Sequence, residues 1–311
     1  MEYGRLGNSG LVVSKIGLGT NNFGGRIDKD QTRAVIERSL DHGITLFDTA
    51  DQYGAGKSEE FIGEILGPQR RHDVIIATKF ASATGESPYA RGTARRYVMQ
   101  AAEASLRRLQ TDYIDLYQVH FPDPHTPVLE TLQALDDLVH QGKVRYIGES
   151  NFAGWQIVDA VWTARSEHLT RPISAQHDYS LLNQDAKREV LPAARAMGLG
   201  VLPFYPLGGG FLTGKYRRGA PLPEGARLTK LPSNRSSRFL NDHNFDLLDK
   251  YEAFARDRGH SLTELAFAWL LGQPEIASVI AGATRPEQVD ENVAAGTWRL
   301  SPEDFEALEH L

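Results

Sequence analysis

Short apolar runs typical of β-strands alternate with longer amphipathic runs along nearly the whole chain. This alternation is the pattern of repeated βα units, in which parallel strands form a sheet that helices cover. The sequence contains eight expected strands, and this number fits a closed α/β barrel, (β/α)8, better than an open doubly wound sheet. The eight expected strands lie near Ile16–Gly19, Leu46–Asp48, Val74–Lys79, Ile114–Val119, Val144–Ser150, Ser174–Gln176, Gly200–Phe204 and Val279–Ala281.

The runs between these strands carry helix signals. Residues 28–43 repeat apolar positions at near-helical spacing and end at a glycine, and residues 93–109 behave likewise. Before the first strand, two strand-like pieces flank Asn8-Ser9-Gly10, which predicts an N-terminal β-hairpin. We expect this hairpin to cap the base of the barrel.

One long segment, Pro206–Asp242, follows the seventh strand and is rich in glycine, proline, arginine and serine without sustained periodicity. It is longer than an ordinary βα connection, and loops of that length are usually functional lids or disordered. Helical runs follow at residues 243–259 and 261–273. Because no interdomain linker interrupts the alternation, we expect a single domain over residues 1–311.

Composition and charge narrow the class of protein. The net charge of −6 at pH 7 lacks the concentrated basic footprint of a nucleic-acid binder. The chain has no cysteine, which excludes disulfides and thiolate metal sites and is compatible with a reducing compartment. The N-terminal residues contain no apolar signal core, and no run approaches the roughly 18 apolar residues of a membrane span. We therefore expect a cytoplasmic protein without a nucleic-acid or membrane partner.

Four polar residues stand at or just after the ends of apolar strand-like runs: Asp48, Tyr53, Lys79 and His120. In a parallel barrel the C-terminal ends of the strands meet on one face, and catalytic residues gather there. We expect the four side chains to form one proton-donating site.

The four residue types suit the reduction of a carbonyl group. A carbonyl accepts hydride more readily when its oxygen receives a proton or a strong hydrogen bond in the transition state. Tyrosine, with a reference pKa of about 10, is normally too weak an acid, and a nearby ammonium lowers that pKa by favouring the phenolate. Lys79 would supply the charge, Asp48 would hold Lys79, and His120 would orient the carbonyl oxygen.

At these residues the chain resembles the aldo-keto reductase family. The resemblance implies a TIM barrel that binds NAD(P)H at its C-terminal face, with Tyr53 as general acid in a tetrad with Asp48, Lys79 and His120. The family also includes ion-channel β subunits, which resemble bacterial members of this kind. The similar segments are GLGTNNFGG, DTADQYGAGKSEEFIGEIL, ATKF, LYQVHFPDP, GKVRYIGESNF, YSLLN and GATRPEQVDENV, nearly the whole chain.

The resemblance also implies a set of cofactor contacts. Ser150, Asn151 and Gln176 would hydrogen-bond the nicotinamide carboxamide, and Phe204 would stack on the ring where many relatives have tyrosine. Arg285 would pair with a ribose 2′-phosphate, so NADP(H) is the preferred cofactor and NAD(H) a possible one. The complete set is Gly19, Thr20, Asn21, Asp48, Ser150, Asn151, Gln176, Phe204, Tyr205, Pro206, Leu207, Gly209, Gly214, Lys215, Gly282, Thr284, Arg285, Gln288, Glu291 and Asn292.

Two patterns point to other nucleotide chemistry but are incomplete. Tyr53 and Lys57 have the Tyr-x-x-x-Lys spacing of short-chain dehydrogenases, yet no glycine-rich turn follows a first strand. Residues 209–215 resemble a phosphate-binding P-loop, but Tyr216 occupies the position that requires serine or threonine. Neither pattern supports a Rossmann or P-loop site.

Hydrolase and metal patterns are weaker still. The segment GESNF begins like a nucleophile elbow but ends in Phe152 rather than glycine. Its Glu149 also departs from the small apolar residue common there in the family, and this substitution has no physical account at the level of sequence. His120, Asp123 and His125 lie among prolines without metal-site spacing, so we expect no metal.

The leading hypothesis is therefore an NADPH-dependent reductase of aldehydes or ketones, whose partner is a small carbonyl compound. A nucleotide-binding regulatory subunit with weak or no turnover is the second hypothesis. A cofactor-independent lyase that forms a Schiff base on Lys79 is the third. The intact tetrad favours catalysis over the regulatory role.

Overall fold

The computed structural model describes residues 1–230 and 232–311, without the side chain of Arg235. Its centre is a parallel sheet with the strand order β10-β3-β4-β5-β6-β7-β8-β9. Val201 pairs with the segment before β10 through backbone hydrogen bonds of 2.8 and 3.0 Å, which closes the sheet into a barrel. This confirms the predicted (β/α)8 barrel. The strands are β3 (Ile16–Gly19), β4 (Leu46–Asp48), β5 (Ile75–Phe80), β6 (Ile114–Val119), β7 (Val144–Ser150), β8 (Pro172–Asp178), β9 (Gly200–Phe204) and β10 (Val279–Gly282).

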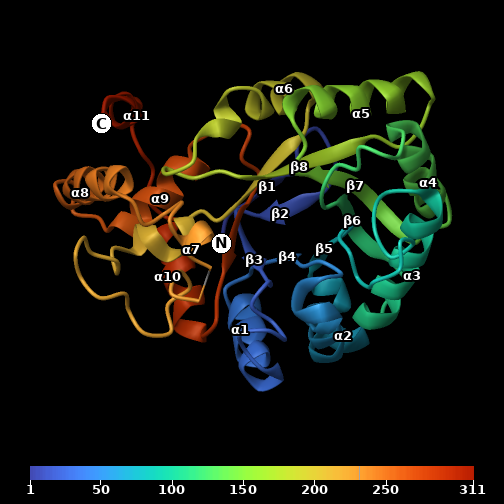
Figure 1. Cartoon of the computed structure of the whole chain (residues 1–311), viewed down its shortest axis with the longest axis horizontal. Helices are drawn as coiled ribbons and strands as arrows, with labels where there is room; N and C mark the ends of the chain where they lie inside the picture. Colours follow the sequence, from blue (N-terminus) through green and yellow to red (C-terminus); the bar gives the residue numbers. More distant parts are fainter. Residues whose placement is uncertain (231) are drawn as a thin grey trace.

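Helices surround the sheet as a ring (Figure 1). Their buried faces pack on the outer face of the barrel and form the larger hydrophobic core with it. The predicted amphipathic runs are helical, which agrees with their 3.6-residue periodicity. The helices are α1 (Lys29–Asp41), α2 (Lys57–Arg70), α3 (Arg95–Leu109), α4 (Val128–His140), α5 (Gly154–Ser166), α6 (Val190–Met197), α7 (Ser233–Ser236), α8 (Asp242–Arg256), α9 (Leu262–Leu271), α10 (Pro286–Ala295) and α11 (Pro302–Glu309).

An N-terminal hairpin closes the base of the barrel. Its strands β1 (Tyr3–Arg5) and β2 (Val12–Ser14) are antiparallel, as the sequence predicts. Leu6 and Val13 are fully buried and join the smaller core inside the barrel. The barrel interior is therefore filled from below, and only its C-terminal face is open to a ligand.

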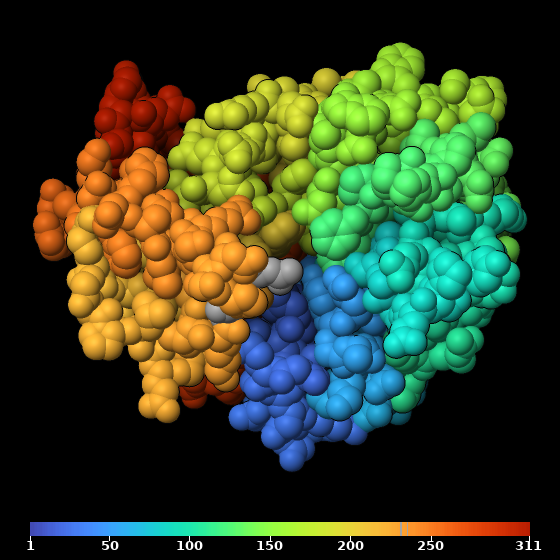
Figure 2. All heavy atoms as spheres, in the orientation of Figure 1, coloured from blue at the N-terminus to red at the C-terminus, as the bar shows by residue number. Residues whose placement is uncertain are grey.

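The long segment after β9 lies beside the C-terminal mouth of the barrel, where Figure 2 shows it in orange-yellow next to the central hollow. Within Pro206–Asp242 the structure has a 3-10 turn, Gly208–Thr213, and the short helix α7, while Leu231 lies outside the described residues. Arg238 ties the segment to the barrel rim through an ion pair of 2.6 Å with Asp178. No helix within the described part of the chain is long and apolar enough to cross a membrane.

Candidate active site

A cavity of about 1230 Å3 opens at the C-terminal face of the barrel. Pockets for small ligands usually measure about 300–1,000 Å3, so this one has room for a ligand of dinucleotide size. Residues from most of the strand ends and the following loops line it, which is where parallel barrels place their chemistry. These include Gly19, Asp48, His120, Asn151, Gln176, Phe204 and Gly282.

Lys79 and Asp48 form a buried ion pair at the floor of this cavity. The Lys79 Nζ lies 2.8 Å from Asp48 Oδ2 and donates to the Thr49 carbonyl at 2.9 Å, and its side chain is fully buried. Gln176 Nε2 donates to the other Asp48 oxygen at 2.8 Å. Burial works against the ammonium, but Asp48 and Tyr53 hold the pKa of Lys79 above its ordinary value. Both charges are thus paired and hydrogen-bonded, as buried charges require.

Tyr53 stands beside this pair on a tight turn after β4. Gly54 and Ala55 adopt the left-handed region, with φ of 57° and 56°, and so turn the chain sharply after Tyr53. The Lys79 Nζ lies 5.2 Å from the centre of the Tyr53 ring. Burial raises the pKa of Tyr53, and the nearby Lys79 ammonium offsets only part of that rise.

The expectation that Lys79 lowers the pKa of Tyr53 below its reference value is therefore wrong for this structure. The sequence shows the ammonium but not the burial of the phenol, and burial disfavours the phenolate. A raised pKa keeps the phenol protonated near neutral pH. Tyr53 is thus an available proton donor, and Lys79 acts on the phenolate that forms when the proton leaves.

His120 follows β6 and faces Tyr53 edge-on, with 5.9 Å between ring centres. Its backbone carbonyl accepts a hydrogen bond of 2.9 Å from Asn151 Nδ2, which ties the ends of β6 and β7 together. Burial, with a further contribution from Lys79, lowers the pKa of His120 to about 3. The ring is therefore neutral at physiological pH, and it can donate a hydrogen bond without carrying charge.

Two amides at the rim suit recognition of a carboxamide. The side-chain nitrogens of Asn151 and Gln176 are used within the protein, by the His120 carbonyl and by Asp48. Their oxygens have no partner among the described residues, so each can accept a hydrogen bond from an amide NH2 of a ligand. Phe204 lines the same part of the cavity.

Ser150 is the exception at this rim. Its hydroxyl donates to the Gln176 carbonyl at 3.1 Å and accepts from Asn151 Nδ2 at 3.0 Å. It is 1% exposed and does not reach the cavity surface. Ser150 therefore orients the Asn151 amide in this structure rather than facing a ligand.

The loop after β9 forms the next part of the wall. Tyr205, Pro206, Leu207 and Gly209 line the cavity, and Tyr205 adopts a left-handed φ of 55°. Lys215 also reaches the surface, but Gly214 does not. Apart from Ser150 and Gly214, the cofactor contacts expected at the strand ends and in this loop line the same cavity.

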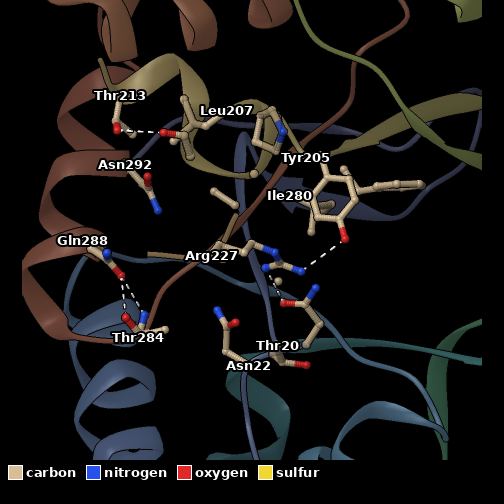
Figure 3. A pocket seen from close by; sticks show the side chains of 18 of the residues that line it. Thr20, Asn22, Tyr205, Leu207, Thr213, Arg227, Ile280, Thr284, Gln288 and Asn292 are labelled. Carbon is tan, nitrogen blue, oxygen red and sulfur yellow. Dashed lines mark hydrogen bonds between the residues drawn. The ribbon is translucent and has the colours of Figure 1, made fainter. Parts of the chain in front are cut away.

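The far end of the cavity is built by the turn into α10 (Figure 3). The backbone N–H of Thr284 and its hydroxyl both donate to Gln288 Oε1, at 2.8 and 3.1 Å. Arg285 lies near Glu287 and Glu291 at 3.5 and 3.7 Å, with 55% of its side chain exposed. These loose contacts leave its guanidinium free to face an added anion. Gly282 and Asn292 line this end as well.

Two arginines in the wall were not anticipated from the sequence. Arg227 crosses the cavity and donates to the Tyr205 hydroxyl at 3.2 Å and to Asn21 at 3.4 Å (Figure 3). Arg26 donates to the Gly225 carbonyl at 3.1 Å, so it joins the loop after β3 to the long segment. Both lie in irregular segments, where no periodicity marks which side chains turn inward.

With Lys215 and Arg285, these arginines give the outer cavity four cationic side chains. Their mutual effect is visible at Lys215, whose pKa is lowered by burial and then by Arg26 and Arg285. Such crowding of like charges is stabilised by a bound anion. The donor set therefore fits a phosphorylated ligand.

The alternative patterns do not assemble into sites. Lys57 is exposed at the start of α2, whereas Lys79 is the lysine beside Tyr53. No cluster of three metal-ligating side chains occurs within residues 1–230 and 232–311. Tyr216 is fully buried, and residues 215–220 are irregular backbone and turn rather than helix, so residues 209–215 do not form a P-loop followed by a helix.

Glu149 lies behind the cavity wall. Ser150 and Gln176 pair in the β7–β8 register, and Gln176 reaches inward to Asp48, so alternation places Glu149 on the outer face of β7. It is 2% exposed, and neither carboxyl oxygen has a hydrogen-bond partner among the residues that the structure describes. Burial raises its pKa well above the ordinary value. Glu149 is thus a buried acid outside the site.

Similarity to known proteins extends over nearly the whole chain, including the residues that line the cavity. The profile of the aldo/keto reductase family matches residues 15–311. The uncharacterized oxidoreductase YrpG of Bacillus subtilis (strain 168) is 38% identical, over 100% of this chain and 96% of the relative. Two proteins named probable voltage-gated potassium channel subunit beta, from Arabidopsis thaliana and Oryza sativa subsp. japonica, are 34% and 35% identical. Each alignment spans 95% of this chain and 91% of the relative.

Proposed function

Because the chain belongs to the aldo/keto reductase family, we propose that it reduces aldehydes or ketones to alcohols with NADPH as the preferred reductant. Members of this family generally use nicotinamide cofactors. The observation that carries the proposal is the buried Lys79–Asp48 pair beside Tyr53, at the floor of a cavity large enough for a dinucleotide.

The residues of the site divide the work of the reduction. A bound reduced nicotinamide supplies the hydride that the carbonyl carbon accepts. Tyr53 gives its phenolic proton to the carbonyl oxygen, which completes the alcohol. The Lys79 ammonium stabilises the phenolate left on Tyr53, and Asp48 keeps that ammonium charged and fixed. His120 donates a hydrogen bond to the oxygen while charge builds there.

The outer cavity supports the choice of NADPH. The phosphates of a dinucleotide would lie among Arg26, Lys215, Arg227 and Arg285, and the turn before α10 adds the N-terminus of a helix. By the resemblance to the family, Arg285 would pair with the extra 2′-phosphate, and its long, exposed contacts to carboxylates leave it available to do so. A guanidinium suits a phosphate there.

A substrate panel tests the proposal directly. Purified protein is assayed against aldehydes, ketones, sugars and steroids by loss of nicotinamide absorbance, with NADPH and NADH in parallel. We expect turnover of at least one carbonyl class, faster with NADPH at low cofactor concentration. Cofactor binding without turnover of any class would reject the reductase proposal.

The named channel subunits among the relatives favour one second candidate, a nucleotide-binding regulatory subunit. It predicts tight cofactor binding with little turnover, so the same panel separates the two.

The Schiff-base lyase is less favoured because a free amine is the nucleophile in such chemistry, and Asp48 and Tyr53 raise the pKa of Lys79 so that it stays protonated. Borohydride trapping of Lys79 by a carbonyl compound would support the lyase. A cytoplasmic location and a small carbonyl partner are proposed with the reductase.

A further inference from the structure

The amide NH2 of Gln52 and the hydroxyl of Ser82 converge on one nitrogen of the His120 ring. Gln52 Nε2 lies 3.4 Å and Ser82 Oγ lies 3.5 Å from His120 Nδ1. The other ring nitrogen, Nε2, has no hydrogen-bond partner in the part of the chain that the structure describes. We propose that Gln52 and Ser82 are positioning residues that keep the His120 proton on Nε2, so that this N–H is presented to the substrate carbonyl.

The effect of the His120 tautomer on catalysis depends on the proposed function, whereas the contacts around His120 do not. Because the His120 ring is neutral, one nitrogen carries the proton and the other accepts. Which nitrogen carries it is decided by what the opposite nitrogen meets. The amide NH2 of Gln52 can donate but not accept, so its approach from the solvent side favours an unprotonated Nδ1. The Ser82 hydroxyl can donate or accept, and beside an unprotonated Nδ1 it acts as a second donor.

The backbone holds Ser82 in this place by several contacts. Ala81, which links the end of β5 to Ser82, has a φ of 93°, a conformation costly for a residue with a Cβ atom. The Ala81 carbonyl accepts from the Gly92 N–H at 3.0 Å, and the Ser82 carbonyl accepts from the Tyr97 hydroxyl at 3.1 Å. Ser82 itself is 8% exposed. A strained residue held by its neighbours fits a positioning role.

Gln52 is delivered by the turn that also carries Tyr53. It immediately precedes Tyr53, whose N–H is bonded to the Ala50 carbonyl at 3.2 Å. The general acid and one donor to His120 therefore move together. Both hydrogen bonds to Nδ1 are long, as is common before a ligand closes a catalytic site.

Loss of both donors would allow water to give or take a proton at Nδ1. The two neutral forms of the ring would then mix. In the form with the proton on Nδ1, the lone pair of Nε2 would face the lone pairs of the carbonyl oxygen. That fraction of the enzyme would lack the hydrogen bond that stabilises developing charge.

Nitrogen NMR of the cofactor-free protein reads the tautomer without any turnover. The chain has ten histidines, so 15N-histidine-labelled protein is compared with His120→Asn to assign the signals. We expect an unprotonated Nδ1 and a protonated Nε2 in the parent. The Ser82→Ala, Gln52→Met double variant should shift both signals toward averaged values, and Gln52→Glu, which offers an acceptor, should move the proton toward Nδ1. A protonated Nδ1 in the parent, or unchanged signals in the double variant, would overturn the inference.

Kinetics with the best substrate of the panel give the second readout. The double variant should lose about two- to tenfold in kcat with KM nearly unchanged, the range of one or two net hydrogen bonds. The single variant Ser82→Thr keeps the hydroxyl, so its kcat should stay near that of the parent. Matched controls are Ser87→Ala, on the same loop, and Gln100→Met, on the exposed face of α3. Losses of kcat in the controls equal to those in the double variant would also overturn the inference. If the parent shows the expected tautomer but no turnover of any substrate, only the reductase proposal is rejected.

Discussion

The two ends of the cavity hold their polar groups in different ways. At the catalytic end, Lys79 and Asp48 are buried and joined at 2.8 Å, and Gln176 completes the set from across the barrel. At the far end, Arg285 is half exposed and contacts its carboxylates at 3.5 and 3.7 Å. One end is thus arranged before any ligand binds, and the other keeps its charges available.

The difference follows from what each end does. Stabilising charge in a transition state requires donors that do not reorganise during the reaction, and a buried floor fixed by strand ends provides them. Binding a phosphate needs charge that can exchange one partner for another, and exposed side chains on loops and helix ends provide that. Substitutions at the two ends should therefore affect different measured quantities.

The largest effect is expected from Tyr53→Phe. The ring is kept and only the proton donor is lost, so turnover should fall by about 10²- to 10⁴-fold. Affinity for the cofactor, measured by fluorescence quenching, should be nearly unchanged. A Phe variant that retains more than about a tenth of the parent turnover would contradict the general-acid role.

Lys79→Met should come next, with most activity lost, because Asp48 then keeps a buried charge without its partner. Lys57→Met is the matched control, since Lys57 is exposed at the start of α2 and should change turnover by less than about twofold. Circular dichroism checks that both variants fold. The reverse ranking would reassign the lysine of the site to Lys57.

Arg285→Ala tests the other end of the cavity. Charge-assisted contacts contribute about 1.5–3 kcal/mol. We expect the low end of that range, roughly a tenfold weaker affinity for NADPH, because the side chain is half exposed. Affinity for NADH and the turnover at saturating NADPH should hardly change.

A second arginine serves as control for that measurement. Arg299 is also partly exposed and paired with a glutamate, Glu2, but lies outside the cavity. Arg299→Ala should leave both cofactor affinities unchanged. Equal weakening of NADPH and NADH by Arg285→Ala would show that Arg285 does not read the 2′-phosphate.

The two ends also differ in how far the sequence predicts them. Asp48, Lys79 and His120 stand where apolar runs end, and barrel strands bring such positions together, so local pattern was enough. Arg227 lies in a segment without periodicity, and its place in the wall depends on how the long loop crosses the mouth. The direction of the Tyr53 pKa was missed for a related reason, because burial is a property of the whole fold.

Glu149→Gln should have the smallest effect on turnover, below about twofold. It tests what burial does to a carboxyl group that has no charged partner, in contrast to Asp48. Glu149 is as buried as the catalytic floor, but its carboxyl group has no hydrogen-bond partner in the described part of the chain. Burial raises the pKa of Glu149 in the folded state, so the folded protein keeps a proton that the unfolded chain loses above pH of about 4.3.

That difference fixes the sign of a pH effect on stability. Protonated Glu149 favours the folded state at low pH, and this contribution is lost as pH rises, by up to about 1.4 kcal/mol per pH unit until the folded pKa is reached. Gln cannot titrate, so the free energy of unfolding of Glu149→Gln relative to the parent should increase from pH 5 to pH 8 in urea titrations. A gap that stays constant with pH would mean that Glu149 ionises in the folded protein as easily as in the unfolded chain. Burial alone would then not distinguish it from Asp48, whose charge is held by Lys79 and Gln176.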